Sequence, residues 1–439
     1  MKTALKTIIA VILSAGILLS VSGCKPISTD TDSLMTPPAY AKDLKDIQKV
    51  LYGSVGDKFT LKFPTGGDYR SAIVQEDING DGVTEAFAFY STTVDNTVTM
   101  HINMIVKSDG QWVTAGDVKC VASGVESVEF VDMNGDGVKE VLVGWSVYGS
   151  LEKSIGVYSV SDNRLSQSLL EQYTKYICRD FDGDGVSELL VIYLDSAAGK
   201  STAKLIKITQ NGVDELGKAE MDGTVNSYST PLIADLDSGI KYIYLDAVKG
   251  NGMVTEVLVT DGKSLTNPMY DEVAGMTAQT YRSSGVAIRD IDGDGLYEIP
   301  IPQILTKTND SDSDNIYKTQ WYGFNGTGLE LKLSALMNYT DGYFIVIPQK
   351  WEDKISVVRS TAERTRIIRR YDEETGVSAE ELVRILVVPT TAENVDVTGY
   401  TEITRTKDYI YYSKISGYVG EQAITEEELS GLFNILSQS

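Results

Sequence analysis

The stretch DINGDGVTEAFAFY, residues 77–90, places acidic side chains and glycines at a fixed spacing and then becomes apolar. In a tight loop, the side chains at positions 1, 3 and 5 can converge on one point, and glycines at positions 4 and 6 let the backbone turn back on itself. The carbonyl of position 7 and the carboxylate of position 9 would complete a shell of oxygens, the ligands that calcium prefers. The stretch therefore predicts a calcium-binding loop.

The same nine-residue pattern starts again at Asp132, Asp180 and Asp290, and a degenerate copy over residues 235–241 lacks the acid at position 5. Successive starts, the degenerate one included, are 48 or 55 residues apart. This interval indicates a repeat architecture with about four structural calcium ions. The predicted ligands, at positions 1, 3, 5, 7 and 9 of the four intact copies, are Asp77, Asn79, Asp81, Val83, Glu85, Asp132, Asn134, Asp136, Val138, Glu140, Asp180, Asp182, Asp184, Val186, Glu188, Asp290, Asp292, Asp294, Leu296 and Glu298.

The acids of each loop would repel one another without a cation, because they lie only a few ångströms apart. The alternative is a set of Asp-Gly turns whose acids are simply solvated, and four nearly identical copies argue against it. The degenerate copy carries Lys241 in addition to its missing acid. It is therefore predicted to bind calcium weakly or not at all.

Each loop is expected to join two strands. An EF-hand would place its closing glutamate at position 12 and continue into a helix, whereas these loops are followed by runs such as AFAFY and LLVIY. Strand-like runs, among them SAIVQ and GVAIR, also precede the loops. Residues 71–119 contain four such runs, the content of one propeller blade. The expected fold is mainly β, a β-propeller of about five blades, with residues 59–63 (FTLKF) available to close the ring against the last strands.

The pattern D-x-[DN]-G-D-G-x-x-E between strands resembles the FG-GAP or VCBS repeat, the calcium-loop unit of integrin-type β-propellers. The resemblance covers residues 55–337 and is specific in the loops but weak between them. It implies blades of four antiparallel strands around an axis, with the calcium loop between two strands of each blade. The FG and GAP signatures themselves are not clear in this chain.

The first 23 residues carry two lysines, an apolar run over residues 8–19 and small residues before Cys24, which indicates a secretory signal peptide. Residues 21–24 (VSGC) resemble the lipobox of bacterial lipoproteins, in which the cysteine is lipidated. Residues 24–54 are expected to form a flexible tether. The chain is thus expected to be anchored through Cys24 to the extracytoplasmic face of a bacterial cell membrane; a plain signal peptide with a chance cysteine is the alternative.

The repeat stops near residue 338, and residues 338–439 are expected to form a small α+β domain. Its strand-like runs include GYFIVIPQKW, and residues 424–439 are expected to form a helix. Thr425 and Glu428 have the spacing of a capping box. The apolar stripe of this helix would consist of Leu429, Leu432, Phe433 and Leu436.

Composition excludes several classes of function. The net charge of −23 argues against nucleic acid as a partner, because phosphate binding needs clustered lysine and arginine. The single histidine, His101, excludes most histidine-based catalytic and zinc sites and is interpreted as an ordinary strand residue. Cys120 and Cys178 could pair, but two free thiols are expected. The basic run RTRIIRR, residues 364–370, is interpreted as a solvated strand face balanced by acids, with an anionic partner as the alternative.

These features predict a membrane-anchored binding or scaffolding protein whose calcium ions are structural, because catalytic metals are usually single and keep an open coordination position. Its protein or glycan ligand would bind on the propeller face or in the cleft against the C-terminal domain. The alternative is an enzyme of the cell envelope that cleaves carbohydrate with a carboxylate acid/base pair, although no such pair stands apart from the loop acids. A third hypothesis is glycan recognition without catalysis, which exposed tyrosines or tryptophans in a cluster would favour.

Overall fold

The computed structural model describes residues 39–147, 153–162, 164–305, 317–360, 363–372 and 377–436. The predicted signal peptide and Cys24 lie outside these residues. The described chain is mainly β, with strands in six antiparallel sheets. Among the described helices, none is long and apolar enough to cross a membrane.

The first three sheets each contain four consecutive strands whose first two are joined by the intact loop, and the first sheet has one short additional strand before them. The first sheet consists of β1 (Thr60–Leu61), β2 (Ile73–Glu76), β3 (Glu85–Val94), β4 (Thr97–Ser108) and β5 (Gln111–Cys120). The second consists of β6 (Gly124–Val131), β7 (Glu140–Ser146), β8 (Lys153–Ser161) and β9 (Arg164–Tyr173). The third consists of β10 (Lys175–Arg179), β11 (Glu188–Asp195), β12 (Lys200–Thr209) and β13 (Gly212–Met221).

The apolar run of β3 is continuous because both faces of the first sheet are covered. Phe87 and Phe89 lie in the core shared with the second sheet. The alternate residues Ala86 and Ala88 face the helix α3 (Ala39–Val55). Successive strand residues point to opposite faces, so a doubly covered strand is apolar throughout.

Helix α3 corrects the expectation that residues 24–54 form a flexible tether. Ile47 and Leu51 are buried in one core with Ile73 and Ala86, and Leu44 packs against it. These apolar residues recur at helical spacing, so the segment is an amphipathic helix that docks on the first sheet. Asp43 accepts a hydrogen bond from Lys107 at 3.0 Å and adds a polar contact. The part of the tether that precedes residue 39 lies outside the described residues.

The fourth and fifth sheets depart from the regular pattern. The fourth consists of β14 (Ser227–Tyr228), β15 (Leu232–Asp235), β16 (Lys241–Lys249), β17 (Gly252–Thr260) and β18 (Leu265–Thr266). The fifth consists of β19 (Ile299–Ile304), β20 (Tyr317–Phe324), β21 (Leu329–Asn338), β22 (Tyr343–Val346) and β28 (Phe433–Ile435). The expected strand GVAIR is reduced to an isolated bridge between Arg289 and Glu298.

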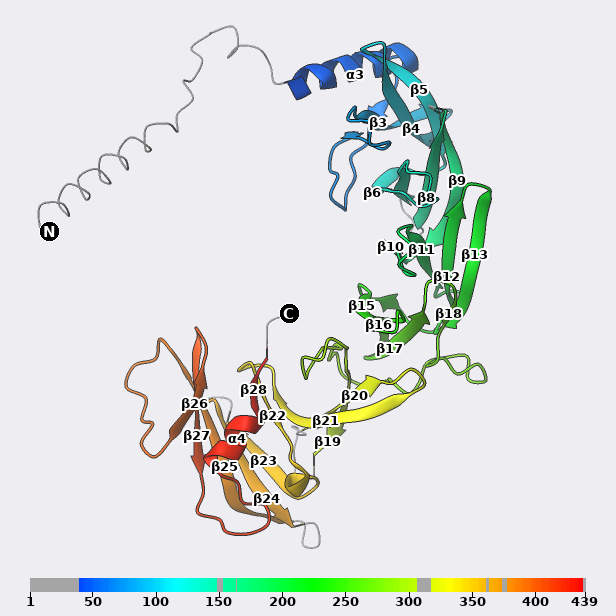
Figure 1. Cartoon of the computed structure of the whole chain (residues 1–439). Helices are drawn as coiled ribbons and strands as arrows, with labels where there is room; N and C mark the ends of the chain where they lie inside the picture. Colours follow the sequence, from blue (N-terminus) through cyan, green and yellow to red (C-terminus); the bar gives the residue numbers. More distant parts are fainter. Residues whose placement is uncertain are drawn as a thin grey trace, which may run out of the picture.

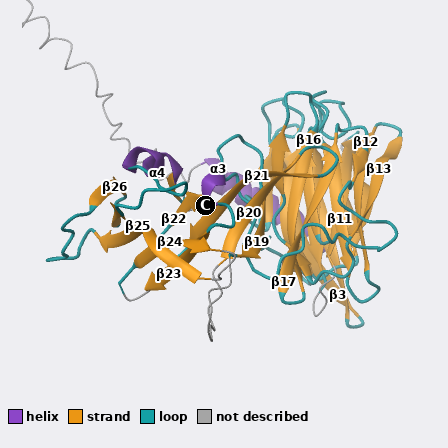
Figure 2. Ribbon diagram, turned by 90° about the horizontal axis from the view of Figure 1, so that it is seen from below, coloured by secondary structure: helices purple, strands orange, loops and turns teal. Residues whose placement is uncertain are grey.

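The five sheets follow one another along an arc that begins at α3 (Figure 1). Their strands run between two edges that carry the loops, and the C-terminal sheet lies to one side (Figure 2). The expected closure by residues 59–63 is wrong, because β1 pairs with β3 of its own sheet. The edge strand β22 of the fifth sheet is instead covered by β28, which comes from the end of the described chain.

The C-terminal sheet contains β23 (Ile355–Ser360), β24 (Thr365–Asp372), β25 (Val377–Pro389), β26 (Thr401–Arg405) and β27 (Tyr409–Ile415). A 3-10 turn η1 (Gln349–Trp351) precedes it, and α4 (Glu426–Leu432) follows it. Its core, which includes Trp351, Ile385 and Leu429, also contains Tyr343 and Ile345 of β22. The run GYFIVIPQKW, expected in the C-terminal domain, therefore begins with a strand of the fifth sheet.

The end of the chain is partly as expected. Thr425 and Glu428 form the capping box at the start of α4. The helix ends at Leu432, earlier than predicted, and Phe433 begins β28. Pairing with β22 satisfies the backbone of this segment and buries Phe433 in the shared core. This long-range pairing overrides the local helical pattern.

Candidate metal loops

The four intact loops have the same backbone geometry, fixed by the aspartate at position 1. Its two carboxylate oxygens accept hydrogen bonds from the glycine amides at positions 4 and 6; for Asp77, these distances are 2.8 and 2.9 Å. Both glycines of the first loop, Gly80 and Gly82, have positive φ values of 71° and 82°. A side chain at either position would strain the turn, so the two glycines are required by the backbone.

The glutamate at position 9 closes each loop from the start of the next strand. One of its oxygens accepts a hydrogen bond from the amide of position 2, for example at 2.8 Å from Met133 to Glu140. The side chain at position 2 is apolar and packs into a core, and Phe181 is completely buried there. Sequence reasoning missed this anchor, although an apolar residue at position 2 of every copy signalled it.

The acidic oxygens of two loops converge as a metal site requires. In the third loop, one oxygen each from Asp180, Asp182 and Glu188 lie within 4.8 Å of one another. In the fifth sheet's loop, the same holds for the aspartates at positions 1, 3 and 5, Asp290, Asp292 and Asp294. In these two loops, the structure therefore brings together three of the side chains that the sequence predicted to be ligands. Carboxylate oxygens in this number are the donors that calcium prefers.

The second oxygen of the closing glutamate distinguishes the loops. Glu298 is fully buried, and its Oε1 has no hydrogen-bond partner among the described residues. In the second loop, Asn134 donates to Oε1 of Glu140 at 2.5 Å. Burial, with a contribution from the loop aspartates, raises the pKa of Glu140 and Glu298 to about 7. Burial likewise raises the pKa of Glu85.

The third loop contains a cation of its own. The ammonium group of Lys207, on β12, lies 2.7 Å from Asp184 Oδ2 and 2.9 Å from Glu188 Oε1. It also lies 3.9 Å from Asp182 Oδ2. Burial opposes its charge, but these contacts prevail and raise the pKa of Lys207. Sequence reasoning counted this loop as equivalent to the others.

The degenerate copy forms a shorter turn between β15 and β16. The carboxylate of Asp235 lies 2.7 Å from Arg179 and 3.5 Å from Lys241. Lys241 pairs with Asp235 across the strands, as Glu85 pairs with Glu76 in the first sheet. A lysine thus stands at the start of β16, where the intact copies have the closing glutamate. The expectation of weak or no calcium binding stays a prediction.

The loops also connect neighbouring sheets. The amide of Lys139, at position 8 of the second loop, donates to the carbonyl of Ile78 in the first loop at 2.8 Å. The Lys139 ammonium lies 2.6 Å from Glu76. Arg179 connects the third and fourth sheets through Asp235 in the same way. A cation that stiffened a loop would therefore also stiffen the joint between two sheets.

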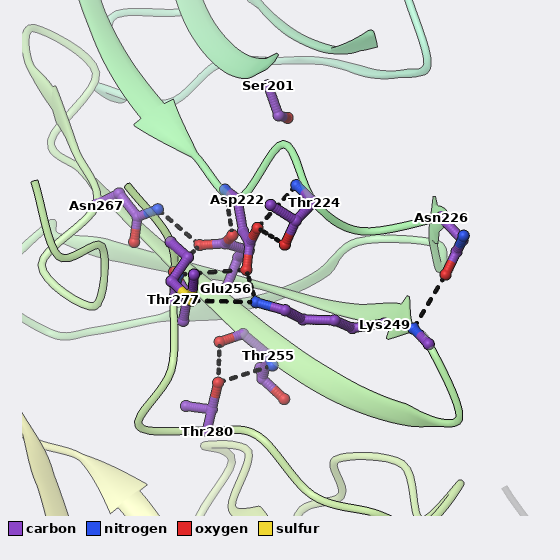
Figure 3. A network of polar contacts seen from close by, with 12 residues as sticks. Ser201, Asp222, Thr224, Asn226, Lys249, Thr255, Glu256, Asn267, Thr277 and Thr280 are labelled. Carbon is purple, nitrogen blue, oxygen red and sulfur yellow. Dashed lines mark hydrogen bonds and ion pairs between the residues drawn. The ribbon is translucent and has the colours of Figure 1, made fainter. Parts of the chain in front are cut away.

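The fourth sheet, whose loop lacks the acid at position 5 and the closing glutamate, contains a buried polar network instead (Figure 3). Lys249 contacts Asp222 at 2.6 Å, and Asp222 is completely buried. Glu256, also completely buried, accepts hydrogen bonds from Asn267 at 2.7 Å and Thr277 at 2.8 Å. These contacts attach the segment after β18 to the sheet.

A second ion pair lies in the same sheet. Arg282 contacts Asp246 at 2.6 Å, and both side chains are almost fully buried. Arg282 also donates to Thr255 at 2.9 Å, while the amide of Ile288 donates to Asp246 at 2.9 Å. In this sheet, the cations that pair with the buried carboxylates are therefore side chains of the protein itself, Lys249 and Arg282.

His101 is a strand residue, as predicted, but it has specific partners. Its Nδ1 lies 2.7 Å from Asp117, and its Nε2 lies 2.9 Å from Thr92. Its ring stacks on Tyr90, with the two ring centroids 4.6 Å apart. Cys120 and Cys178 are free thiols.

The arginine run differs in part from the expectation. Arg364 pairs with Asp341, and Arg370 lies 2.9 Å from Glu380, so these two are balanced by acids. Arg366 instead donates to the carbonyl of Met337 at 2.7 Å. Its guanidinium carbon lies 5.8 Å from the ring centroid of Tyr343. Burial lowers the pKa of Arg366.

A hollow of about 270 Å³ lies between the fifth sheet and the C-terminal sheet, and we call it the junction hollow. It is lined by Tyr317, Tyr339, Arg359 and Arg366, among other residues. The two tyrosines are about half exposed, at 46 % and 52 %. All four tryptophans, in contrast, are buried. Only the tertiary structure brings together the residues that line the junction hollow.

Comparison with solved structures finds matches of low identity and low TM-score. A rhamnogalacturonan lyase from Bacillus licheniformis has 14% identity, a TM-score of 0.29 and coverage of 60% of this chain and 62% of its own. A periplasmic gluconolactonase from Pseudomonas aeruginosa has 12% identity, a TM-score of 0.25 and coverage of 73% and 87%. The Dos1 propeller has 8% identity, a TM-score of 0.26 and coverage of 64% of each chain. No protein-family model matches the sequence, and a search of curated proteins finds no match.

Proposed function

We propose that this protein is a calcium-stabilised binding protein of the cell envelope, with ions held in the loops between the first two strands of its repeated sheets. The observation that carries the proposal is the Oε1 atom of Glu298, which is buried beside three loop aspartates without a hydrogen-bond partner among the described residues. A buried carboxylate oxygen without a partner is costly. A calcium ion at the centre of the loop would supply the missing partner.

The residues at the loops of the first, second and fifth sheets fit this ion. Each offers carboxylate or amide oxygens at positions 1, 3 and 5, a carbonyl at position 7 and a glutamate at position 9. Such hard oxygen donors suit calcium rather than a soft transition metal. The ion would neutralise the loop and tie the glutamate's strand to the turn, so its role is structural.

The binding of calcium is tested on the full-length chain in detergent. Elemental analysis after dialysis against micromolar calcium, with isothermal titration of the EDTA-treated protein, gives the number of ions and their affinity. We expect several ions per chain, and the Asp290→Asn variant should lose one of them because it removes the position 1 carboxylate. Absence of bound calcium at millimolar concentration would overturn the proposal.

Anchoring to the membrane is the second part of the proposal. It rests on the signal-like residues 1–23 and on the VSGC motif that ends at Cys24. Metabolic labelling with a fatty acid, followed by membrane fractionation, tests it. The wild-type chain should carry the label and sediment with membranes, whereas Cys24→Ser should be unlabelled; equal labelling of both chains would exclude this anchor.

The ligand is proposed to be an acidic glycan that binds in the junction hollow. Exposed tyrosine rings can stack on sugar rings, and guanidinium groups bind carboxylates. Tyr317 and Tyr339 are the exposed aromatic residues of this hollow, while Arg359 and Arg366 supply the positive charge. The chain as a whole is strongly acidic, whereas two arginines line this hollow.

Binding of oligogalacturonate and of a neutral maltooligosaccharide of equal length tests this part. We expect the acidic probe to bind and the Tyr339→Ala variant to weaken binding about tenfold, the loss of about 1.4 kcal/mol. Tyr52→Ala is a matched control, because Tyr52 is equally exposed but lies on α3. Equal binding of the two sugars, or equal effects of the two substitutions, would exclude the hollow.

The enzyme alternative gains less support from the geometry. Asp222 and Glu256 are adjacent carboxylates outside the loops, since the Asp222 amide donates to Glu256 at 2.8 Å. Both are completely buried and bonded to Lys249, Asn267 and Thr277. A catalytic pair must reach the substrate, and these two groups serve as structural cross-links.

A further inference from the structure

We infer that Lys207 replaces calcium in the third loop, so that this loop stays cross-linked without metal while the other intact loops require it. The inference rests on the proposed function, because it concerns which of the predicted loops hold the ion. It also revises the expected number of ions from about four to about three.

The position of the Lys207 ammonium group carries the inference. It contacts Asp184 at 2.7 Å and Glu188 at 2.9 Å, and Asp182 lies at 3.9 Å. These residues occupy positions 5, 9 and 3, three of the five predicted ligand positions. The Glu188 side chain has no exposed surface, and Lys207 supplies the partner for its Oε1 that Glu298 lacks in the fifth sheet.

Strand register explains why only the third loop has this cation. In the third sheet, Leu189 pairs with Ile206, so Lys207 follows opposite Glu188. The corresponding pairs in the first, second and fifth sheets place Val106, Ser159 and Gly323 at this position. None of these three side chains carries a charge. The identity of one residue on the third strand therefore decides whether the loop has its own cation.

The fifth sheet supplies a useful contrast, because a lysine approaches its loop without filling it. Lys332, on β21, lies 3.9 Å from Asp294, and it leaves Oε1 of Glu298 without a partner. Gly323 lies beneath the Lys332 side chain, whose Cε is 2.6 Å from the place of an added Cβ. Lys332 thus approaches only one residue at the edge of its loop, whereas Lys207 lies near three of the predicted ligand positions.

Electrostatics also favours exclusion of calcium from the third loop. The ammonium group lies among the same oxygens that a metal ion would bind, and it would have to leave before they could surround the ion. Two cations a few ångströms apart repel each other strongly in a partly buried site. Convergence of Asp180, Asp182 and Glu188 is consistent with either cation, and the contacts of Lys207 identify which one is held.

Counting of bound calcium by elemental analysis and titration, on the full-length chain in detergent, tests the inference. We expect about three ions for the wild type and one more for Lys207→Ser, which places in the third sheet the residue found in the second. Lys332→Ser is the matched control and should leave the number unchanged. Asp180→Asn, which removes the position 1 carboxylate of the third loop, should also leave it unchanged, whereas Asp290→Asn should remove one ion.

The outcomes separate this inference from the proposed function. Four ions in the wild type, or loss of one ion in Asp180→Asn, would overturn the role of Lys207 and leave the calcium-binding loops intact. No increase in a folded Lys207→Ser variant would also overturn it. No calcium in any chain would overturn the proposed function itself. If Lys207→Ser folds only when calcium is present, that dependence supports the inference, because the lost cation must then be supplied from solution.

Discussion

The fourth and fifth sheets both contain buried acidic groups, but they differ in whether the chain supplies the cations that balance them. Each must hold buried acidic groups near the joint with its neighbours. In the fourth sheet, the buried carboxylates of Asp222 and Asp246 face Lys249 and Arg282. In the fifth, Glu298 and the loop aspartates face one rim lysine, and an oxygen of Glu298 remains without a partner.

The difference shows that these repeats share a shape but not a source of positive charge. The third sheet is intermediate, because it keeps the complete acidic loop and adds Lys207. A buried carboxylate needs a cation or hydrogen-bond donors wherever they come from. The stability of some sheets should therefore depend on the calcium concentration, and that of others should not.

Removal of metal should have the largest effect on stability. If it had no effect, the contrast between the fourth and fifth sheets would be wrong. A ligand at a hundredfold excess over its dissociation constant stabilises the native state by about 2.7 kcal/mol per site. With several sites, EDTA should lower the melting temperature of the full-length chain by roughly 10 °C or more. Scanning calorimetry in EDTA and in millimolar calcium measures this. Identical melting curves would show that the acidic loops do not depend on calcium.

Arg282→Met should be the most damaging single change, and its effect should not depend on calcium. It would leave Asp246 buried without its cation, which costs about 3–5 kcal/mol. Chemical denaturation in EDTA and in calcium should give the same loss. A loss that calcium largely repaired would mean that the fourth sheet is coupled to the loops. Arg405→Met is a suitable control, because Arg405 pairs with Glu402 on the surface.

The effect of Glu298→Gln on stability should change sign between EDTA and calcium, which would sharpen the contrast between the two sheets. In EDTA, the substitution replaces a buried carboxyl group, whose Oε1 has no partner among the described residues, by a neutral amide, so stability should stay the same or rise. In calcium, it removes a ligand, and the chain should lose about 2–3 kcal/mol relative to the wild type. Glu188→Gln should instead destabilise the chain in both conditions by about 1–3 kcal/mol, because it weakens the Lys207 contact. Parallel behaviour of the two variants would contradict the distinction between the loops.

The pH dependence of stability should follow from the same buried glutamates. Burial raises the pKa of Glu140 and Glu298 from 4.5 to about 7. The folded state then binds more protons than the unfolded state, so stability present below the unfolded pKa is lost as the pH rises through about 7. In EDTA, the melting temperature should fall from about pH 5 to about pH 8. The gain from calcium should grow over the same interval, because the metal needs ionised carboxylates. A melting temperature in EDTA that rose over this interval would contradict the prediction.

Much of the fold could be predicted from local sequence. The apolar runs that flank the loops predicted the strands on either side of the first three loops, and the residues of the capping box predicted the start of α4. Long-range pairing defeated the prediction elsewhere. Phe433 has helical spacing with Leu429 but joins β22, and the residues around Ile47 form a docked helix where a flexible tether is expected.

By itself, the sequence determined which oxygen-bearing side chains meet in each loop, because these side chains and the glycines lie within nine residues and one turn brings them together. Tertiary structure alone decided which loop has a cation of its own. Lys207 lies far along the chain from Asp180, and only the pairing of β11 with β12 places it beside Glu188. The junction hollow depends in the same way on strands from two sheets. Charge neutralisation requires contact, and contacts between distant residues are set by strand register rather than by local pattern.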